Sequence, residues 1–118
     1  MGGTDNSSGK KGEELARYFL EDKGWRFVTA NWACKLGEID LIMDDGSTRV
    51  FVEVRTRRRT SYGEGLDTIG WQKQRKLMRA AQAYQQAMDY WGDVRFDVVS
   101  IELDPGGDPK FTYIADVF

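Results

Sequence analysis

The chain has 118 residues, of which 41% are hydrophobic and 31% charged, and its net charge is −2. This composition is typical of a single globular domain and argues against a protein that binds polyanions over its whole surface. The absence of histidine excludes Ser-His-Asp triads, Cys-His pairs and histidine-ligated zinc, so oxygen atoms would have to hold any metal.

Cysteine content and the length of apolar runs indicate where the protein is located. Cys34 is the single cysteine, so no internal disulfide can form and we expect a reducing, cytoplasmic location. No apolar run approaches the roughly 20 residues that span a bilayer, so no membrane association is expected. Residues 1–11 are rich in Gly and Ser and lack the apolar segment of a signal peptide. We expect a flexible tail there and one domain over residues 12–118.

The elements are predicted from hydrophobic periodicity. Apolar residues at helical spacing predict a helix over residues 13–23, which Gly24 ends. Three strands, a long helix after a Gly-rich loop at 62–65, and two further strands are then predicted over residues 25–32, 37–43, 50–56, 69–91, 95–103 and 111–117. This order, α-β-β-β-α-β-β, predicts an α/β fold with a mixed sheet flanked by helices. The long helix between the third and fourth strands predicts that these two strands are parallel.

An acidic residue interrupts each of two neighbouring apolar strands. Asp40 lies in the run GEIDLIM and Glu53 in VFVEVRTR, where an unpaired charge is costly to bury. The segment between them, 44–47, is a strong turn signal, so the strands should form a hairpin. Two buried carboxylates on adjacent strands, followed by the basic Arg55, predict a divalent-metal site.

The register of this hairpin decides whether the acids meet. A two-residue turn at Asp45 and Gly46 places Asp40 diagonal to Glu53 on one face. A four-residue loop over residues 45–48 places the two acids directly opposite each other. A three-residue loop would place them on opposite faces. Two of these three registers therefore favour a shared cation.

Basic residues gather between Arg55 and Arg79. The stretch has eight basic residues and only two acidic ones, Glu64 and Asp67. The basic residues are Arg55, Arg57, Arg58, Arg59, Lys73, Arg75, Lys76 and Arg79. This density is typical of a phosphate-binding patch, and equally of a solvated helix face beside a charged loop.

Asp97 and the aromatic residues are expected to have mainly structural roles. Asp97, in a later apolar strand, is expected to pair with Arg95 or another arginine rather than with a metal. The long helix has an apolar stripe, which comprises Leu77, Ala80, Ala81, Tyr84, Met88 and Trp91. The four tryptophans are expected mostly to pack in the core, although Trp71 could instead stack on an unpaired base.

Four segments of the sequence are distinctive, namely 12–16 (GEELA), 37–42 (GEIDLI), 51–57 (FVEVRTR) and 95–99 (RFDVV). In this order they resemble the YraN family of uncharacterised bacterial proteins. The family is predicted to have the restriction-endonuclease-like PD-(D/E)XK fold and is distantly similar to archaeal Holliday-junction resolvases. The resemblance implies that Asp40 and Glu53 are metal ligands, that Glu13 completes the site, and that the Val54 carbonyl is a further ligand.

The chain departs from the superfamily motif at Arg55, where lysine is usual. Arginine stays charged and can stabilise a phosphorane, but it cannot act as a neutral amine. Lys73, at the start of the following helix, is the expected substitute amine, with an ordinary surface lysine as the alternative.

Together these features predict a nuclease that depends on Mg²⁺ or Mn²⁺ and cleaves DNA, either branched or single-stranded. Asp40, Glu53, Arg55 and Lys73 would perform catalysis, and Arg57, Arg58, Arg59 and Lys76 would contact flanking phosphates. A homodimer is expected if the substrate has two-fold symmetry. One alternative is a catalytically weak or inactive nucleic-acid-binding module of the same fold. Another is an assembly protein that uses exposed aromatics, namely Tyr84, Tyr90 and Trp91.

Overall fold

The structure, a computed structural model, describes residues 7–58 and 70–117, with the backbone alone for 7–10 and 58. The described elements follow the predicted order and are α1 (Ser7–Glu21), β1 (Arg26–Cys34), β2 (Gly37–Asp45), β3 (Thr48–Arg58), α2 (Trp71–Met88), β4 (Val94–Leu103) and β5 (Lys110–Ile114). None of the described helices is long and apolar enough to cross a membrane.

The helix boundaries differ from the sequence prediction. α1 begins at Ser7, so residues 7–11 form its start instead of belonging to the tail. The expected start of α2 at residue 69 and the Gly-rich loop at 62–65 lie outside the described residues. α2 ends at Met88 because Asp89 adopts a left-handed conformation, with φ of 52°, and its N–H bonds back to the carbonyls of Gln85 and Gln86.

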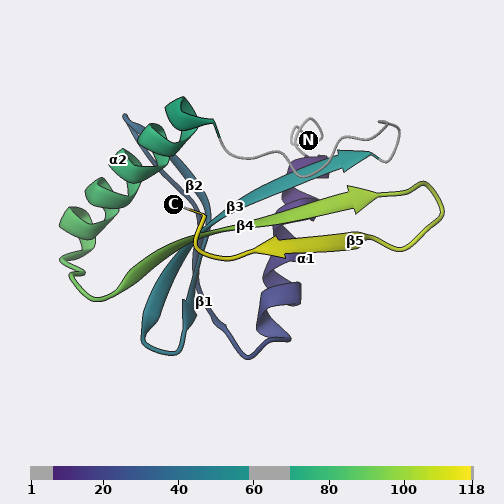
Figure 1. Ribbon diagram of the computed structural model, residues 1–118, viewed down its shortest axis with the longest axis horizontal. Helices are drawn as coiled ribbons and strands as arrows, with labels where there is room; N and C mark the ends of the chain where they lie inside the picture. Colours follow the sequence, from purple (N-terminus) through teal and green to yellow (C-terminus); the bar gives the residue numbers. More distant parts are fainter. Residues whose placement is uncertain (1–6, 59–69, 118) are drawn as a thin grey trace.

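The strands form one mixed sheet in the order β1-β2-β3-β4-β5 (Figure 1). All neighbours are antiparallel except β3 and β4, which pair in parallel from Arg49–Val94 to Arg58–Leu103. The mixed sheet and the parallel pair confirm the fold predicted from the order of elements. α2 makes the long connection between these two strands.

The turn of the β2–β3 hairpin lies one residue later than the predicted two-residue turn at Asp45 and Gly46. Asp45 pairs with Thr48, which leaves Gly46 and Ser47 as the turn, and Gly46 has the positive φ of 62° that hairpin turns favour in glycine. The resulting register pairs Asp44 with Arg49. It is the register of the four-residue loop, although the loop itself is shorter.

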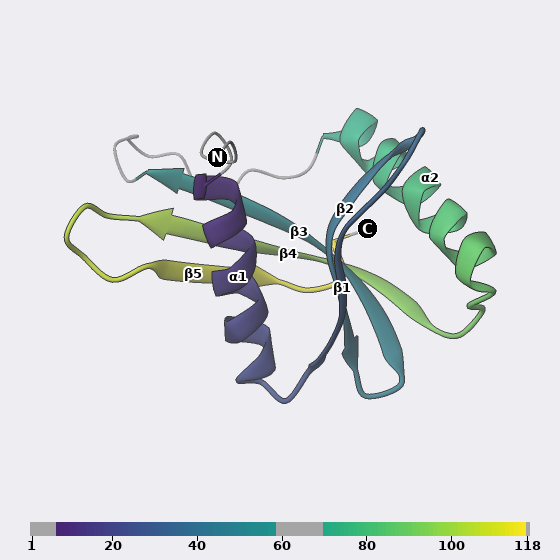
Figure 2. The same cartoon turned by 180° about the vertical axis from the view of Figure 1, so that it is seen from behind.

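The two helices cover opposite faces of the sheet and of its core (Figures 1 and 2). Ala16 and Leu20 of α1 pack on the face whose buried residues are Leu41, Met43, Val50, Val52, Val99 and Ile101. Ala80, Ala81 and Tyr84 of α2 pack on the other face, against Ile39, Ile42 and Phe51. Side chains alternate along β3 and along the Leu41–Met43 part of β2, so both faces are buried, whereas Ile39 packs on the α2 face although its parity is that of Leu41.

A glycine lets each helix approach the sheet closely. A Cβ on Gly12 of α1 would overlap the hydroxyl of Thr56 on β3. A Cβ on Gly37, at the start of β2, would lie 3.3 Å from the Lys76 carbonyl oxygen of α2. These approaches fix α1 on β3 and the first half of α2 on β2.

β2 and β3 separate partway along their length, and we call this point the fork. Their backbone pairing stops at Leu41–Val52. Beyond it β2 stays paired with β1 as far as Cys34–Gly37, while β3 stays paired with β4. Figures 1 and 2 show the two arms diverging, with α2 on the β1–β2 arm and α1 across the β3–β4–β5 arm. The next residue on each strand beyond the last pair is acidic.

Candidate functional site

Asp40 lies in the fork. Continuing the β2–β3 register by one residue places it opposite Glu53, as one of the two predicted registers required. Its Oδ2 accepts a hydrogen bond of 2.9 Å from the backbone N–H of Val54, so the side chain bridges the strands where their backbone pairing has ended. Burial, and next the charge of Glu53, raises the pKa of Asp40 to about 7, although the Val54 N–H opposes this shift.

Glu53 is buried in β3 on the face that α2 covers. Its relative exposure is 7%, and its parity along β3 is that of the core residue Phe51. The Nζ of Lys73, in the first turn of α2, lies 3.2 Å from Glu53 Oε2. Lys73, for which the sequence indicated either a substitute amine or an ordinary surface lysine, is thus half-exposed and lies beside Glu53 at the fork.

Glu13 approaches the fork from α1. The close contact of the preceding Gly12 with Thr56 holds this part of the helix against β3. The charges of Glu13 and Glu38 both raise the pKa of Asp40, after the larger effects of burial and Glu53. The negative charges of Glu53, Glu13 and Glu38 thus all act on the carboxylate of Asp40, which is largely shielded from water.

The donor chemistry fits a hard divalent cation in part. Carboxylate oxygens are the ligands that Mg²⁺ and Mn²⁺ prefer, and the repulsion around Asp40 is what a cation would relieve. Within residues 7–58 and 70–117, however, no three acidic side chains are close enough together to hold a metal. The side chains of Asp40 and Glu53 would supply two ligands, and Glu13 or the Val54 carbonyl would have to complete the set.

The remaining described residues of the predicted site lie on β3 and α2. Arg55 and Arg57 follow Glu53 on β3 with the same parity, and both are half-buried. Lys76 is exposed on α2. The side chain of Arg58 and all of Arg59 lie outside the described part of the chain.

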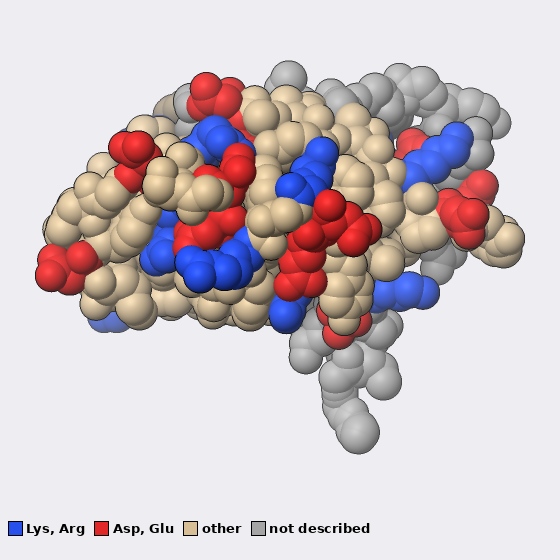
Figure 3. Space-filling model, turned by 90° about the horizontal axis from the view of Figure 1, so that it is seen from below, with Lys and Arg blue, Asp and Glu red and all other residues tan. Residues whose placement is uncertain are grey.

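Charge is mixed over the surface near the hairpin end of the sheet. Figure 3 shows acidic and basic side chains interleaved on this face, without a continuous basic area. Asp44 and Arg49 contribute a double contact of 2.9 and 3.0 Å, and Arg49 also donates to the hydroxyl of Tyr84. The hydrogen bonds from Arg49 hold the pKa of Asp44 below its usual range.

Comparison with known proteins decides the family. The profile of the uncharacterised protein family UPF0102 matches residues 12–101, which include the whole fork. The chain belongs to this family. A UPF0102 protein of Stutzerimonas stutzeri is 46% identical over 95% of this chain and 94% of its own length. UPF0102 proteins of Pseudomonas syringae pv. syringae and Nocardia farcinica are 41% and 39% identical, each over 98% of this chain and 95% and 92% of their own lengths. UPF0102 is the YraN family, so the family named from the sequence motifs is confirmed.

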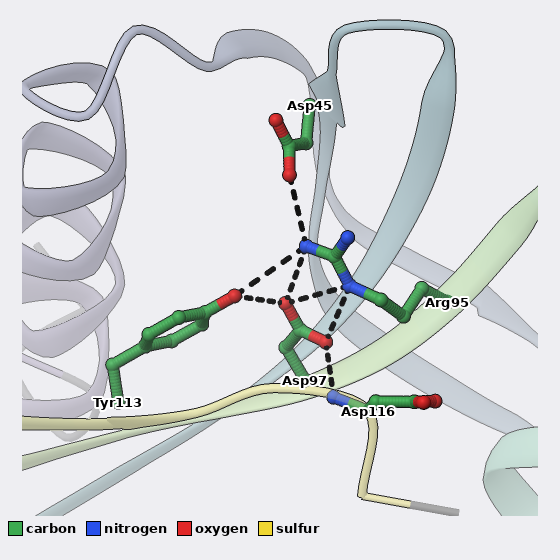
Figure 4. A network of polar contacts seen from close by, with 5 residues as sticks. All are labelled: Asp45, Arg95, Asp97, Tyr113 and Asp116. Atoms are coloured by element: carbon green, nitrogen blue, oxygen red, sulfur yellow. Dashed lines mark hydrogen bonds and ion pairs between the residues drawn. The ribbon is translucent and has the colours of Figure 1, made fainter.

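In this UPF0102 protein, Asp97 pairs with Arg95 as the sequence predicted. The carboxylate is buried, and Arg95 donates to both of its oxygens at 3.0 Å (Figure 4). The Tyr113 hydroxyl donates at 2.6 Å and the backbone N–H of Asp116 at 2.8 Å. Arg95 also contacts Asp45, so the network joins β4, β5 and the hairpin tip at the closed end of the fork.

Three aromatic predictions for this UPF0102 protein differ from the structure, whereas the exposure of Trp91 expected for an assembly protein is confirmed. Tyr84 is buried because its ring packs edge-on against Trp32 and Phe51, so it offers no surface to a partner. The apolar stripe of α2 ends at Tyr84, and beyond it Met88 and Trp91 are exposed. Trp71 is also exposed, with the Arg75 guanidinium 5.3 Å from its ring centroid, so it is not a core residue.

Sequence reasoning missed Asn31. The β1–β2 register pairs Ala30 with Leu41 and Trp32 with Ile39, which leaves Asn31 opposite Asp40. Asn31 has a left-handed φ of 55°, which interrupts the regular pairing at this position. An asparagine within the apolar run FVTANWA was the available signal, because asparagine tolerates this conformation better than most residues.

Proposed function

We propose that this protein is a metal-dependent nuclease that hydrolyses phosphodiester bonds in DNA, with the fork as its active site. The observation that carries the proposal is the juxtaposition at the fork. Two carboxylates from adjacent strands, Asp40 and Glu53, face each other under partial burial, and the Lys73 ammonium lies beside one of them. Buried, mutually repelling acids with an adjacent cation are typical of sites that work on charged substrates.

The expected cation is Mg²⁺ or Mn²⁺, held by Asp40 and Glu53 with Glu13 and the Val54 carbonyl. When bound, such an ion lowers the pKa of a water molecule and offsets phosphate charge. In the reaction, the water oxygen attacks phosphorus in line and the bond from phosphorus to the leaving sugar oxygen breaks. The water gives up one proton to solvent, and the leaving oxygen takes one from solvent.

The side chains near the acids would contribute by charge and position. The Lys73 ammonium, 3.2 Å from Glu53, and the Arg55 guanidinium on the same strand face would stabilise the additional negative charge on the phosphoryl oxygens. Arg57 and Lys76, with Arg58 and Arg59, would bind phosphates on either side of the cleaved bond. In this proposal the protein acts on branched or single-stranded DNA in the cytoplasm, and a homodimer would suit a two-fold symmetric substrate.

A second candidate is a nucleic-acid-binding module with little or no catalysis. Two observations favour it, namely arginine at position 55 and the lack of a three-carboxylate group among the described side chains. The arginine cannot serve as a neutral amine, and two acidic ligands alone would hold a cation weakly.

Cleavage and binding assays separate the two candidates. Plasmid, single-stranded and four-way-junction DNA are incubated with the protein in Mn²⁺ or EDTA, alongside Asp40→Asn, Glu53→Gln and the exposed control Asp22→Asn. The nuclease predicts Mn²⁺-dependent nicking that both fork variants lose and the control keeps. Nicking that persists in Asp40→Asn would reject the site. Binding without nicking in the wild type supports the second candidate, and neither activity rejects both.

A further inference from the structure

We infer that a pocket between α1 and β1 binds one unpaired nucleobase of the DNA strand whose phosphate lies at the fork, and that it prefers bases with an exocyclic amino group. This inference rests on the proposed function and specifies its substrate. The pocket has a volume of about 240 Å³, below the roughly 300–1,000 Å³ of sites for drug-sized ligands. It has room for a small flat ring, whereas a whole nucleotide would leave its sugar and phosphate outside.

The lining of the pocket divides into an apolar part and a polar part. Phe27, Ala30 and Leu41 supply the apolar part of the lining, and the Arg17 guanidinium covers one face of the Phe27 ring, so a base would pack against Ala30, Leu41 and this guanidinium. The polar residues are Glu13, Glu14, Arg17 and Asn31. Aromatic and apolar surface with a few polar groups is the usual way in which proteins hold an unstacked base.

The pocket adjoins the fork through three of its residues. Glu13 lines the pocket and its charge also acts on Asp40. Asn31 lies opposite Asp40 in the β1–β2 register, and Leu41 follows Asp40 on β2. A nucleotide whose base enters the pocket would therefore place its sugar and phosphate near Asp40, the residue of the fork that these three side chains adjoin.

Charge selects the base over the phosphate. Glu13 and Glu14 repel phosphate oxygens, but carboxylates accept hydrogen bonds from the amino groups of cytosine, adenine and guanine. Arg17 is already engaged, since its Nε lies 3.0 Å from Glu21 and its guanidinium 3.8 Å from the Phe27 ring centroid. Thymine has no exocyclic amino group to offer these carboxylates, so it should bind less tightly.

The test measures binding in EDTA, so that it does not depend on cleavage. Fluorescence anisotropy compares short single-stranded oligonucleotides of deoxycytidine, of thymidine and of abasic sugar. Ala30→Leu fills the pocket, and Ala33→Leu, at an exposed position of the same strand, is its control. Glu14→Gln, at an exposed position of α1, removes one acceptor charge without a packing change.

We expect the deoxycytidine strand to bind about fivefold more tightly than the thymidine strand, as one good base contact allows. Ala30→Leu should abolish the preference, Glu14→Gln should reduce it, and Ala33→Leu should retain it. Equal affinity for the three strands, or a preference that persists in Ala30→Leu, would reject the pocket while leaving DNA binding at the fork intact. Absence of DNA binding by every variant and by the wild type, in Mn²⁺ as well, would reject the proposed function itself.

Discussion

The carboxylate of Asp40 accepts the backbone N–H of Val54 at 2.9 Å, so a side chain joins β2 to β3 immediately beyond their last backbone pair. The bond has two consequences. It orients the acid towards the residue after Glu53, and it gives the charged form a partner in a place where water is largely excluded. This hydrogen bond does not offset the effects of burial and of the Glu53 charge, because the pKa of Asp40 is still raised to about 7.

Replacing Asp40 should therefore stabilise the protein at high pH. Because the folded-state pKa of about 7 exceeds the ordinary value of 3.8, the folded state binds the proton more tightly and stability falls as pH rises between these values. Asp40→Asn removes this penalty and keeps an oxygen that can accept from Val54. We expect it to increase the free energy of unfolding by about 1–3 kcal/mol near pH 8, with no gain near pH 4.

Urea unfolding in EDTA at several pH values measures this difference. Asp22→Asn, an exposed acid after α1, should show almost no pH-dependent change. An Asp40→Asn variant that is less stable than the wild type at pH 8 would show that burial does not destabilise the charged carboxylate of Asp40.

Gly12→Ala should destabilise the protein, although alanine normally favours a helix. The added Cβ would overlap the Thr56 hydroxyl, so α1 or Thr56 must move. We expect a loss of about 1–3 kcal/mol in thermal or urea unfolding, against the gain of about 0.5–1 kcal/mol at an unconstrained helix position. Thr56→Ala in the same chain should recover much of the loss, and additive effects of the two changes would contradict the contact.

Asp97→Ala should be among the most destabilising single changes at a polar residue. It leaves the Arg95 guanidinium and the Tyr113 hydroxyl without their shared acceptor, which costs about 3–5 kcal/mol for a buried pair. Tyr113→Phe removes one hydrogen bond to a charged group and should cost about 1.5–3 kcal/mol. Urea unfolding measures both, and Asp97→Ala with a cost no larger than Tyr113→Phe would show that the remaining contact of Arg95 with Asp45 compensates for the lost carboxylate.

Lys73→Met should separate chemistry from stability. The pair with Glu53 is half-exposed on the lysine side, so its loss should change the free energy of unfolding by about 1 kcal/mol or less. If Lys73 stabilises the phosphoryl charge, cleavage in Mn²⁺ should fall by about tenfold or more. Lys110→Met, at an exposed position of β5, should leave the rate unchanged. Unchanged cleavage in Lys73→Met would assign the lysine a structural role only.

The acid pair was predictable because alternation along a strand depends only on sequence. Once the 44–47 turn signal indicated a hairpin, Asp40 and Glu53 could meet in two of three registers, and the structure has one of them. The position of the turn was not predictable, since Asp45 and Gly46 form as good a turn pair as Gly46 and Ser47. Which register wins depends on burying apolar residues against both helices.

Tertiary contacts explain what the sequence could not show. Helical spacing placed Tyr84, Met88 and Trp91 on one stripe, but the sheet reaches only as far as Tyr84, so the other two are exposed. The close approach of Gly12 to Thr56 joins segments far apart in the chain, and no sequence periodicity predicts it. Lys73 could be suspected from its position near a helix start, yet only the packing of α2 on β2 brings it to Glu53.

The order of folding follows from where the fork residues lie in the chain. Asp40, Glu53 and Val54 all belong to one hairpin, which closes a short loop and should form early. Lys73 belongs to α2, whose docking accompanies the later parallel pairing of β3 with β4. We therefore expect the two acids to be brought together before the positive charge of Lys73 reaches Glu53. Docking of α2 completes the second core and supplies the cation in the same step, so an incompletely folded chain lacks an assembled site.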